Sequence, residues 1–208
     1  IRNSSLGKLG VLTDEIILSI LDSLPAKSLL HTSASSKVLY VFAHHDDLWK
    51  ALTLQEFDGD FEFSKNWKET YCRRKAGASY PGHRPLKVDG FYSDLLFQPW
   101  LCSSLLLDPD WVRVNNVDRR SNLSLQQFID EYERPNRPVI ITDVVTKWPA
   151  LRKWRSRKYL LDLAGDRTFA AGAAQQISLP RYFRYSDACR EEKPLYLFDK
   201  KFVEKCGG

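Results

Sequence analysis

The stretch RPVIITDVVTKWPALRKW, Arg137 to Trp154, carries the strongest clue to the fold of this chain. After Pro138 the residues are continuously apolar and β-branched, a pattern typical of a strand buried on both faces. Trp-Pro and Lys-Trp pairs follow the strand. The stretch gains meaning from the elements expected on either side of it.

Those neighbours alternate between helix and strand patterns. Upstream, Ser124 and Gln127 form a capping box ahead of an amphipathic helix that Pro135 ends. Downstream, residues 156–165 read as a capped helix that stops at glycine. RTFAAG (167–172) and PLYLF (194–198) read as strands, separated by a helix that opens at Pro180. We therefore expect an α+β arrangement in this half of the chain.

The N-terminal part has a helical pattern throughout. In LTDEIILSILDSL (12–24), Thr13 is placed to cap the helix and Pro25 closes it. Its apolar stripe consists of Ile16, Ile17, Ile20, Leu21 and Leu24. Two further short helices are expected in residues 27–45 and 46–57. Three short helices bury little surface between them, so this unit is marginal alone and gains from a partner.

These helices resemble an F-box. The resemblance rests on the acidic pair that opens the first helix, the SLPAKSLL break (23–30), KVLY (37–40) and Trp49; Thr13 stands where the family usually has proline. It implies binding to the Skp adaptor of a cullin-RING ubiquitin ligase through Leu12, Ile16, Ile17, Leu24, Pro25 and Leu29. The alternative is that the same stripe is only the core of a helical domain.

HHDDLW (44–49) contains the pattern His-x-Asp twice, which is part of the usual non-haem iron signature. It falls at the junction of two helices, where an F-box has a polar turn. We therefore interpret Asp46 or Asp47 as an N-cap. An iron site also needs a distal histidine and a rigid strand, so we do not expect a metal here.

The second half, with ISLPRYFRYSDACREEKPLYLFD (177–199), resembles the entrance to a JmjC domain, the cupin-type barrel of iron- and 2-oxoglutarate-dependent oxygenases. It is similar to the Jumonji lysyl hydroxylase branch and to plant and fungal F-box JmjC proteins, over about Leu9 to Glu204. The resemblance assigns Tyr196 to the distal carboxylate of 2-oxoglutarate, and strand alternation points it toward a buried site. The alternative is a core tyrosine.

An absence limits the chemistry expected of this chain. The family holds Fe(II) with His-x-Asp/Glu and a distal histidine, but the last histidine here is His83. We expect no catalytic residues, metal ligands or cofactors in this chain; Fe(II) and 2-oxoglutarate would belong to a full-length parent. We expect three parts along the chain. The first is an all-α F-box-like unit (9–75), and the second is a connecting segment (76–120) that includes an aromatic-rich, packed stretch. The third is the N-terminal part of a JmjC double-stranded β-helix (121–208), which forms an incomplete barrel. The chain also lacks methionine and is interpreted as a fragment.

Two hypotheses for function remain. The chain derives either from an F-box and JmjC protein hydroxylase or demethylase, or it is a non-catalytic F-box adaptor that recruits a target. Only the charge favours a nucleic-acid role. The net charge is +5, and the whole excess of Lys and Arg over Asp and Glu lies after residue 75. The basic residues are densest at RKWRSRK (152–158), which can equally be a solvated helix face. We do not expect nucleic acid or membrane as partners. Scattered, reduced cysteines and the absence of a signal peptide favour the nucleus or cytoplasm.

Overall fold

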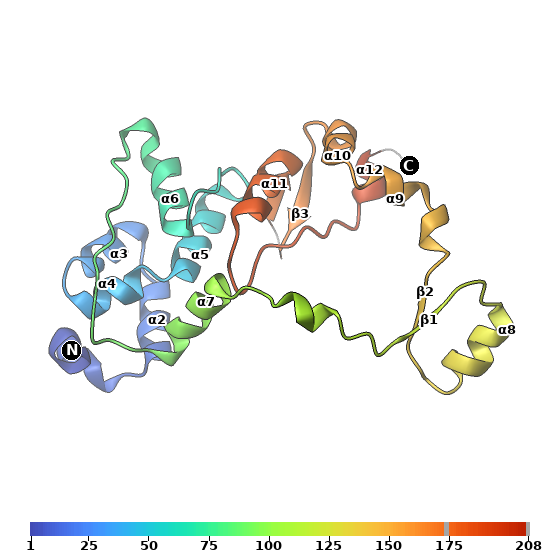
Figure 1. Ribbon diagram of the computed structural model, residues 1–208. Helices are drawn as coiled ribbons and strands as arrows, with labels where there is room; N and C mark the ends of the chain where they lie inside the picture. Colours follow the sequence, from blue (N-terminus) through green and yellow to red (C-terminus); the bar gives the residue numbers. More distant parts are fainter. Residues whose placement is uncertain (173–174, 207–208) are drawn as a thin grey trace. The chain divides into compact units, whose positions relative to one another are not determined.

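The computed structural model describes residues 1–172 and 175–206, and packing divides the chain into two compact units. Unit 1 comprises residues 1–105 and 166–208, and unit 2 comprises residues 106–165. Helices dominate and the strands are short (Figure 1), and the strands of the described residues form two two-stranded sheets and no closed barrel. None of the described helices is long and apolar enough to cross a membrane.

Unit 1 begins with a bundle of short helices. In chain order these are α1 (Arg2–Leu6), η1 (Gly7–Val11), α2 (Asp14–Asp22), α3 (Ala26–Ser33), α4 (Lys37–Ala43), α5 (Asp46–Phe57) and α6 (Trp67–Ala76). Large apolar side chains fill the space between them, and Phe42, Trp49 and Trp67 are completely buried. The Trp49 indole N–H donates to the Ala43 carbonyl at 2.7 Å, so the ring is satisfied as well as packed. The predicted N-terminal helical unit is present.

The helix starts only partly follow the sequence pattern. Thr13 is the N-cap residue of α2, but its capping bond is absent among the described residues. His45, not an aspartate, is the N-cap residue of α5, so the N-cap prediction for Asp46 or Asp47 is wrong. The reason lies in the next helix, because the Asp46 carboxylate accepts the backbone N–H of Trp67 at 2.9 Å, at the start of α6.

The segment after α6 is irregular, as its composition predicts. A short 3-10 turn, η2 (Gly77–Ser79), leads into an extended run that reaches α7 (Asp94–Ser104). Phe91 packs against Phe42 with ring centroids 5.5 Å apart. Tyr92 and Trp100 are 67% and 58% exposed, so the expectation that this aromatic-rich stretch is packed throughout is wrong.

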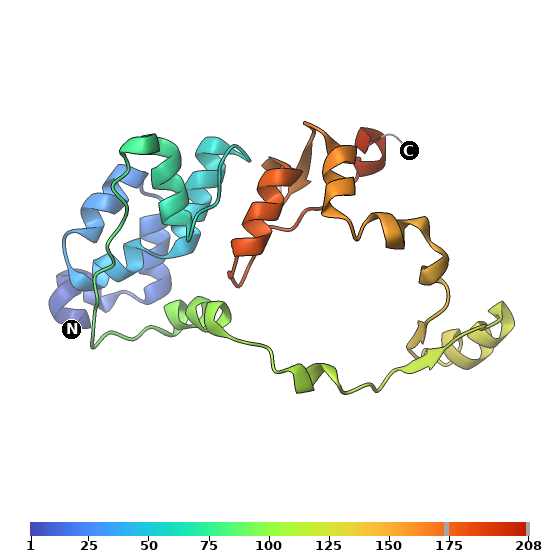
Figure 2. The same ribbon diagram turned by 45° about the horizontal axis from the view of Figure 1, so that its top comes forward.

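The C-terminal part of unit 1 consists of β3 (Thr168–Ala171), β4 (Gln175–Ser178), α11 (Leu179–Ala188) and α12 (Phe202–Cys206). The strands are antiparallel, and α11 runs alongside them (Figure 2). The predicted strand at residues 194–198 is reduced, within the described chain, to one bridge between Ala171 and Leu197. On the edge away from β3, the hydroxyls of Tyr185 and Tyr182 in α11 accept hydrogen bonds from the N–H groups of Leu195 and Leu197. These N–H groups are therefore not available to pair with a further strand.

This C-terminal part packs on α5 and α6. At Gly59 the backbones approach so closely that an added Cβ would lie 1.9 Å from the carbonyl oxygen of Gln176. Ile177, Tyr185 and Leu195 join the buried cluster of the N-terminal helices. Packing therefore joins residues 166–206 to the helical unit, whereas the predicted boundaries at 75 and 120 follow sequence pattern and stay a prediction.

Unit 2 contains η3 (Pro109–Val112), β1 (Asp118–Arg120), α8 (Leu125–Phe128), η4 (Ile129–Glu133), β2 (Val139–Ile141), η5 (Val145–Lys147), α9 (Pro149–Lys153) and α10 (Arg157–Ala164). The predicted capping box at Ser124 is present, and α8 continues as the π-helical turn η4. Strand β2 is only three residues long, pairs in parallel with β1, and leaves Ile140 36% exposed. The prediction of a strand buried on both faces is therefore wrong in this structure.

Candidate protein-docking surface

Helix α2 is apolar on two adjacent faces. Ile17 and Leu21, four residues apart, are each 3% exposed and lie in the core. Ile16 and Ile20 form the next row around the helix and are 47% and 46% exposed. We call Ile16 and Ile20 the outer row of α2. Its two branched side chains face solvent although the core row beside it already anchors the helix.

Further exposed apolar residues lie on the segments that flank this row. Leu9 and Val11 precede α2, and Leu30 lies on α3; they are 42%, 87% and 40% exposed. The start of α2 is fixed by Arg2, whose guanidinium contacts the Asp14 carboxylate and donates to the Leu12 carbonyl at 2.8 Å. The outer row is therefore presented on a positioned helix, which is what a docking surface requires.

The six residues predicted to bind a partner fall into three groups. Ile16 and Pro25 are exposed, and Leu12 and Leu24 are half-buried against the core. Ile17 and Leu29 are 3% and 1% exposed, so they support the surface from beneath. Ile20 and Leu30 are exposed residues that the partner prediction did not include. Ile20 could have been predicted as a contact residue, because it lies four residues after Ile16 and therefore on the same face of the helix.

Tyr196 occupies an exposed position. Alternation along residues 195–198 places Leu195 in the core, at 8% exposure, while Tyr196 and Phe198 are 62% and 61% exposed. The inward orientation argued from strand alternation is therefore not what this chain shows. The assignment of Tyr196 to 2-oxoglutarate stays a prediction from resemblance.

The side chains of HHDDLW contact separate partners. His44 Nδ1 lies 2.7 Å from the Tyr40 carbonyl, and His45 lies 3.6 Å from Asp47. Burial and the nearby Lys68 lower the pKa of His44 to about 4, and burial raises the pKa of Asp46 to about 6. In the described part of the chain, no three His, Cys, Asp or Glu side chains are grouped to hold a metal.

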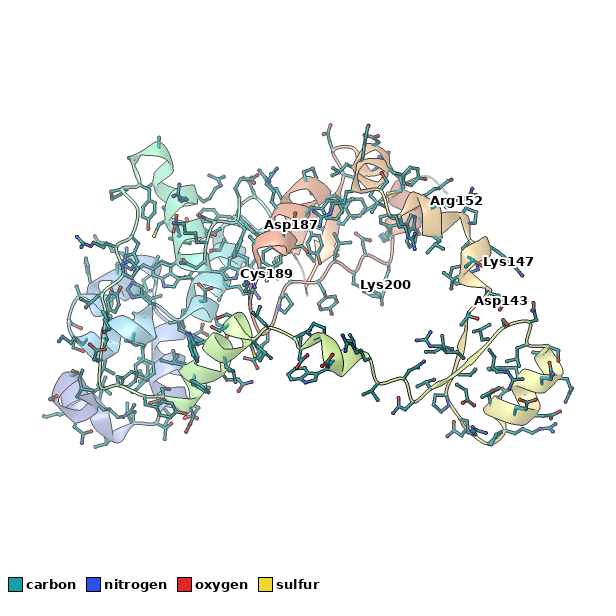
Figure 3. The ribbon with its side chains drawn as sticks, in the orientation of Figure 1. Asp143, Lys147, Arg152, Asp187, Cys189 and Lys200 are labelled. Carbon is teal, nitrogen blue, oxygen red and sulfur yellow. The ribbon has the colours of Figure 1, made fainter. Side chains whose placement is uncertain are left out.

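A polar junction holds the C-terminal part of unit 1 against α5 and α6. The Glu191 carboxylate accepts from Lys50 Nζ at 2.6 Å, from the Trp67 indole at 2.7 Å and from the Tyr185 hydroxyl at 2.8 Å. Cys189, at the end of α11 (Figure 3), lies beside the same carboxylate, and burial raises the pKa of its thiol. The junction is saturated with donors, which suits a structural role.

Comparison with known proteins gives two family matches. An F-box-like domain matches residues 14–55, and a cupin-like domain matches residues 125–204. The first match covers α2, α3, α4 and most of α5, so it contains the outer row of α2. No solved structure gives a significant match.

Two curated plant relatives align with nearly the whole chain. It is 45% identical to the arginine-specific demethylase JMJ22 of Arabidopsis thaliana over 99% of its own length and 41% of that protein. It is 32% identical to the lysine-specific demethylase JMJ21 of the same plant, over 98% of the chain and 22% of the relative. The bifunctional arginine demethylase and lysyl-hydroxylase psr-1 of Caenorhabditis elegans is 32% identical over 49% of the chain and 26% of that protein. The chain thus spans less than half the length of these relatives.

Proposed function

Because the chain joins an F-box-like domain to a cupin-like (JmjC) domain and is homologous to plant JmjC demethylases, we propose that its F-box-like helices dock a Skp-type adaptor of a cullin-RING ubiquitin ligase. The outer row of α2 is the observation that carries this proposal. Leu30 and Pro25 extend the contact, with the half-buried Leu12 and Leu24 at its margin.

The energetics favour an apolar partner at this surface. Ile16 and Ile20 are about half exposed, so covering both contributes roughly 2 kcal/mol, given about 1.5 to 3 kcal/mol for a fully buried side chain. An aspartate at either position would need to be desolvated under the partner instead. Charge at the outer row should therefore weaken docking strongly while leaving the core residues Ile17 and Leu21 in place.

A pull-down with a purified Skp-type adaptor tests the proposal. The double variant Ile16→Asp with Ile20→Asp should bind at least about a hundredfold more weakly than the unchanged chain. The matched control is Val112→Asp with Val114→Asp, which places the same charge on two exposed apolar residues of unit 2. Equal capture of all three proteins would overturn the proposal, and circular dichroism checks that each is folded.

For the cupin-like part, we propose descent from a parent oxygenase that demethylates or hydroxylates protein side chains, as the names of the relatives suggest. The residues present do not fit a complete iron site, because residues 84–208 contain no histidine. Tyr196 offers a phenol suited to a carboxylate of 2-oxoglutarate, which is its proposed role in the parent. We place the protein in the nucleus or cytoplasm, and fractionation with an antibody against the chain tests this.

A further inference from the structure

Lys68, the second residue of α6, holds its amine in an unusual setting. The residue is only 7% exposed, and in the described part of the chain its amine has no carboxylate partner within ion-pair distance. Its Nζ contacts His44 Nε2 and lies 5.6 Å from the centre of the Trp49 ring. Burial lowers the pKa of this amine, which increases its neutral, nucleophilic fraction.

His44 is oriented to accept a proton from that amine. A carbonyl oxygen only accepts hydrogen bonds, so the 2.7 Å contact with the Tyr40 carbonyl requires a proton on His44 Nδ1. Nε2 then presents its lone pair to Lys68. The ring centroids of Tyr40 and His44 lie 3.9 Å apart, and the Tyr40 hydroxyl lies 3.0 Å from His83 Nε2. Amine, imidazole and carbonyl thus form the sequence of nucleophile, base and orienting group.

A cavity opens onto these groups. Its volume is about 330 Å³, and its walls include Tyr40, His44, Lys68, His83 and Leu86, all within unit 1. The Leu86 backbone N–H donates to the Tyr40 hydroxyl at 2.8 Å, which holds the extended segment over the cavity. A volume at the lower end of ligand pockets suits a short acyl group better than a large substrate.

We propose that Lys68 is an acyl-acceptor site for short-chain acyl thioesters, with His44 as its general base. The amine nitrogen attacks the thioester carbonyl carbon, the N–C bond forms, and the C–S bond breaks. His44 Nε2 takes a proton from the amine and returns it to the departing thiolate. The products are an Nε-acyl-lysine and a free thiol, and nothing is oxidised or reduced.

The test measures acylation rates lysine by lysine. The chain is incubated with S-acetyl-N-acetylcysteamine, a small thioester, and each site is quantified by mass spectrometry after digestion. Lys68 should be acetylated about tenfold or more faster than Lys87, whose side chain is 87% exposed. A rate at Lys68 no higher than that at Lys87 would overturn the proposal in the unchanged protein, with no variant needed.

Two variants separate general-base help from simple reactivity. His44→Gln should slow Lys68 at least tenfold and leave the Lys87 rate unchanged. His45→Gln is the matched control, because His45 is paired with Asp47, and both lysine rates should be unchanged. If folded His44→Gln is acetylated at Lys68 as fast as the unchanged chain, the assignment of His44 as the base is wrong.

Discussion

His44 and Asp46, which flank the junction of α4 and α5, should respond to acid with opposite effects on stability. The pKa of His44 falls from 6.5 to about 4, first because burial disfavours the imidazolium and then because Lys68 repels it. The pKa of Asp46 rises from 3.8 to about 6, because burial disfavours its charged form. When either residue is replaced, the pH dependence of the free energy of unfolding should show the contribution of the other residue alone.

The sign follows from which state binds protons first. Between pH 6.5 and 4 the unfolded chain protonates His44 before the folded chain does, so acid lowers the free energy of unfolding. Between pH 6 and 3.8 the folded chain protonates Asp46 before the unfolded chain does, so acid raises the free energy of unfolding. From pH 7 to pH 5 the two effects are a loss of about 2 kcal/mol and a gain of about 1.3 kcal/mol, which leaves a net loss of about 0.5 kcal/mol.

Asp46→Asn should therefore lose about 1.3 kcal/mol more than the unchanged chain between pH 7 and pH 5, and His44→Gln should lose about 2 kcal/mol less. Asparagine keeps an oxygen that can accept the Trp67 N–H, so the contact at the start of α6 survives. Urea unfolding at both pH values, followed by tryptophan fluorescence and circular dichroism, measures these differences.

Asp47→Asn is the control for this experiment. The pKa of Asp47 is lowered, first by its hydrogen bond with His45, so its protonation falls below the measured window. Its pH dependence from pH 7 to pH 5 should match that of the unchanged chain. If Asp46→Asn also matches the unchanged chain, Asp46 is not desolvated and the packing of α5 against α6 is incorrect.

Three further predictions concern unit 1 and the chemistry of the chain. Gly59→Ala should lower the free energy of unfolding by about 2 kcal/mol or more and raise hydrogen exchange in β4, because the new Cβ would meet the Gln176 carbonyl; equal exchange would contradict the close approach. Glu191→Gln should cost about 2 to 4 kcal/mol in urea unfolding, because it leaves Lys50 without its counter-charge; a cost below about 0.5 kcal/mol would show that the junction is solvated. The chain with iron(II), 2-oxoglutarate and ascorbate should form no succinate above the protein-free control, since residues 84–208 lack histidine; turnover lost on changing His44 or His45 would refute this.

Local signals in the sequence predicted local structure well. The capping box at Ser124, the helix that opens near Pro180 and the strand around Phe169 are all present, because each depends on side chains within a few residues. The apolar stripe of α2 was also correctly placed on a helix. Its division into a core row and an outer row could not be predicted, because that depends on which helices pack against it.

Long-range packing explains the strand predictions that were wrong. Apolar character alone does not create a strand partner, and β2 pairs only with β1 in unit 2. Residues 196–198 pair with β3 through two backbone hydrogen bonds around the Ala171–Leu197 bridge, and on the opposite edge the hydroxyls of Tyr182 and Tyr185 accept N–H groups that a further strand would use. The Gln176 N–H bonds to Asp58 across 118 residues of sequence, a contact that no local pattern announces. Tertiary context therefore overrides the strand propensity of these segments.

The C-terminal segment covers α5 and α6 of the helical unit and leaves the outer row of α2 available to a partner. The C-terminal segment contacts α5, α6 and the loop between them, through Lys50, Gly59, Glu62 and Trp67. The outer row lies on α2, and Ile16 and Ile20 stay 47% and 46% exposed with the C-terminal segment in place. Docking at α2 and packing at α5 and α6 therefore use different surfaces and do not compete for the same apolar area. The C-terminal segment supplies burial that three short helices lack, and the outer row remains exposed for a partner.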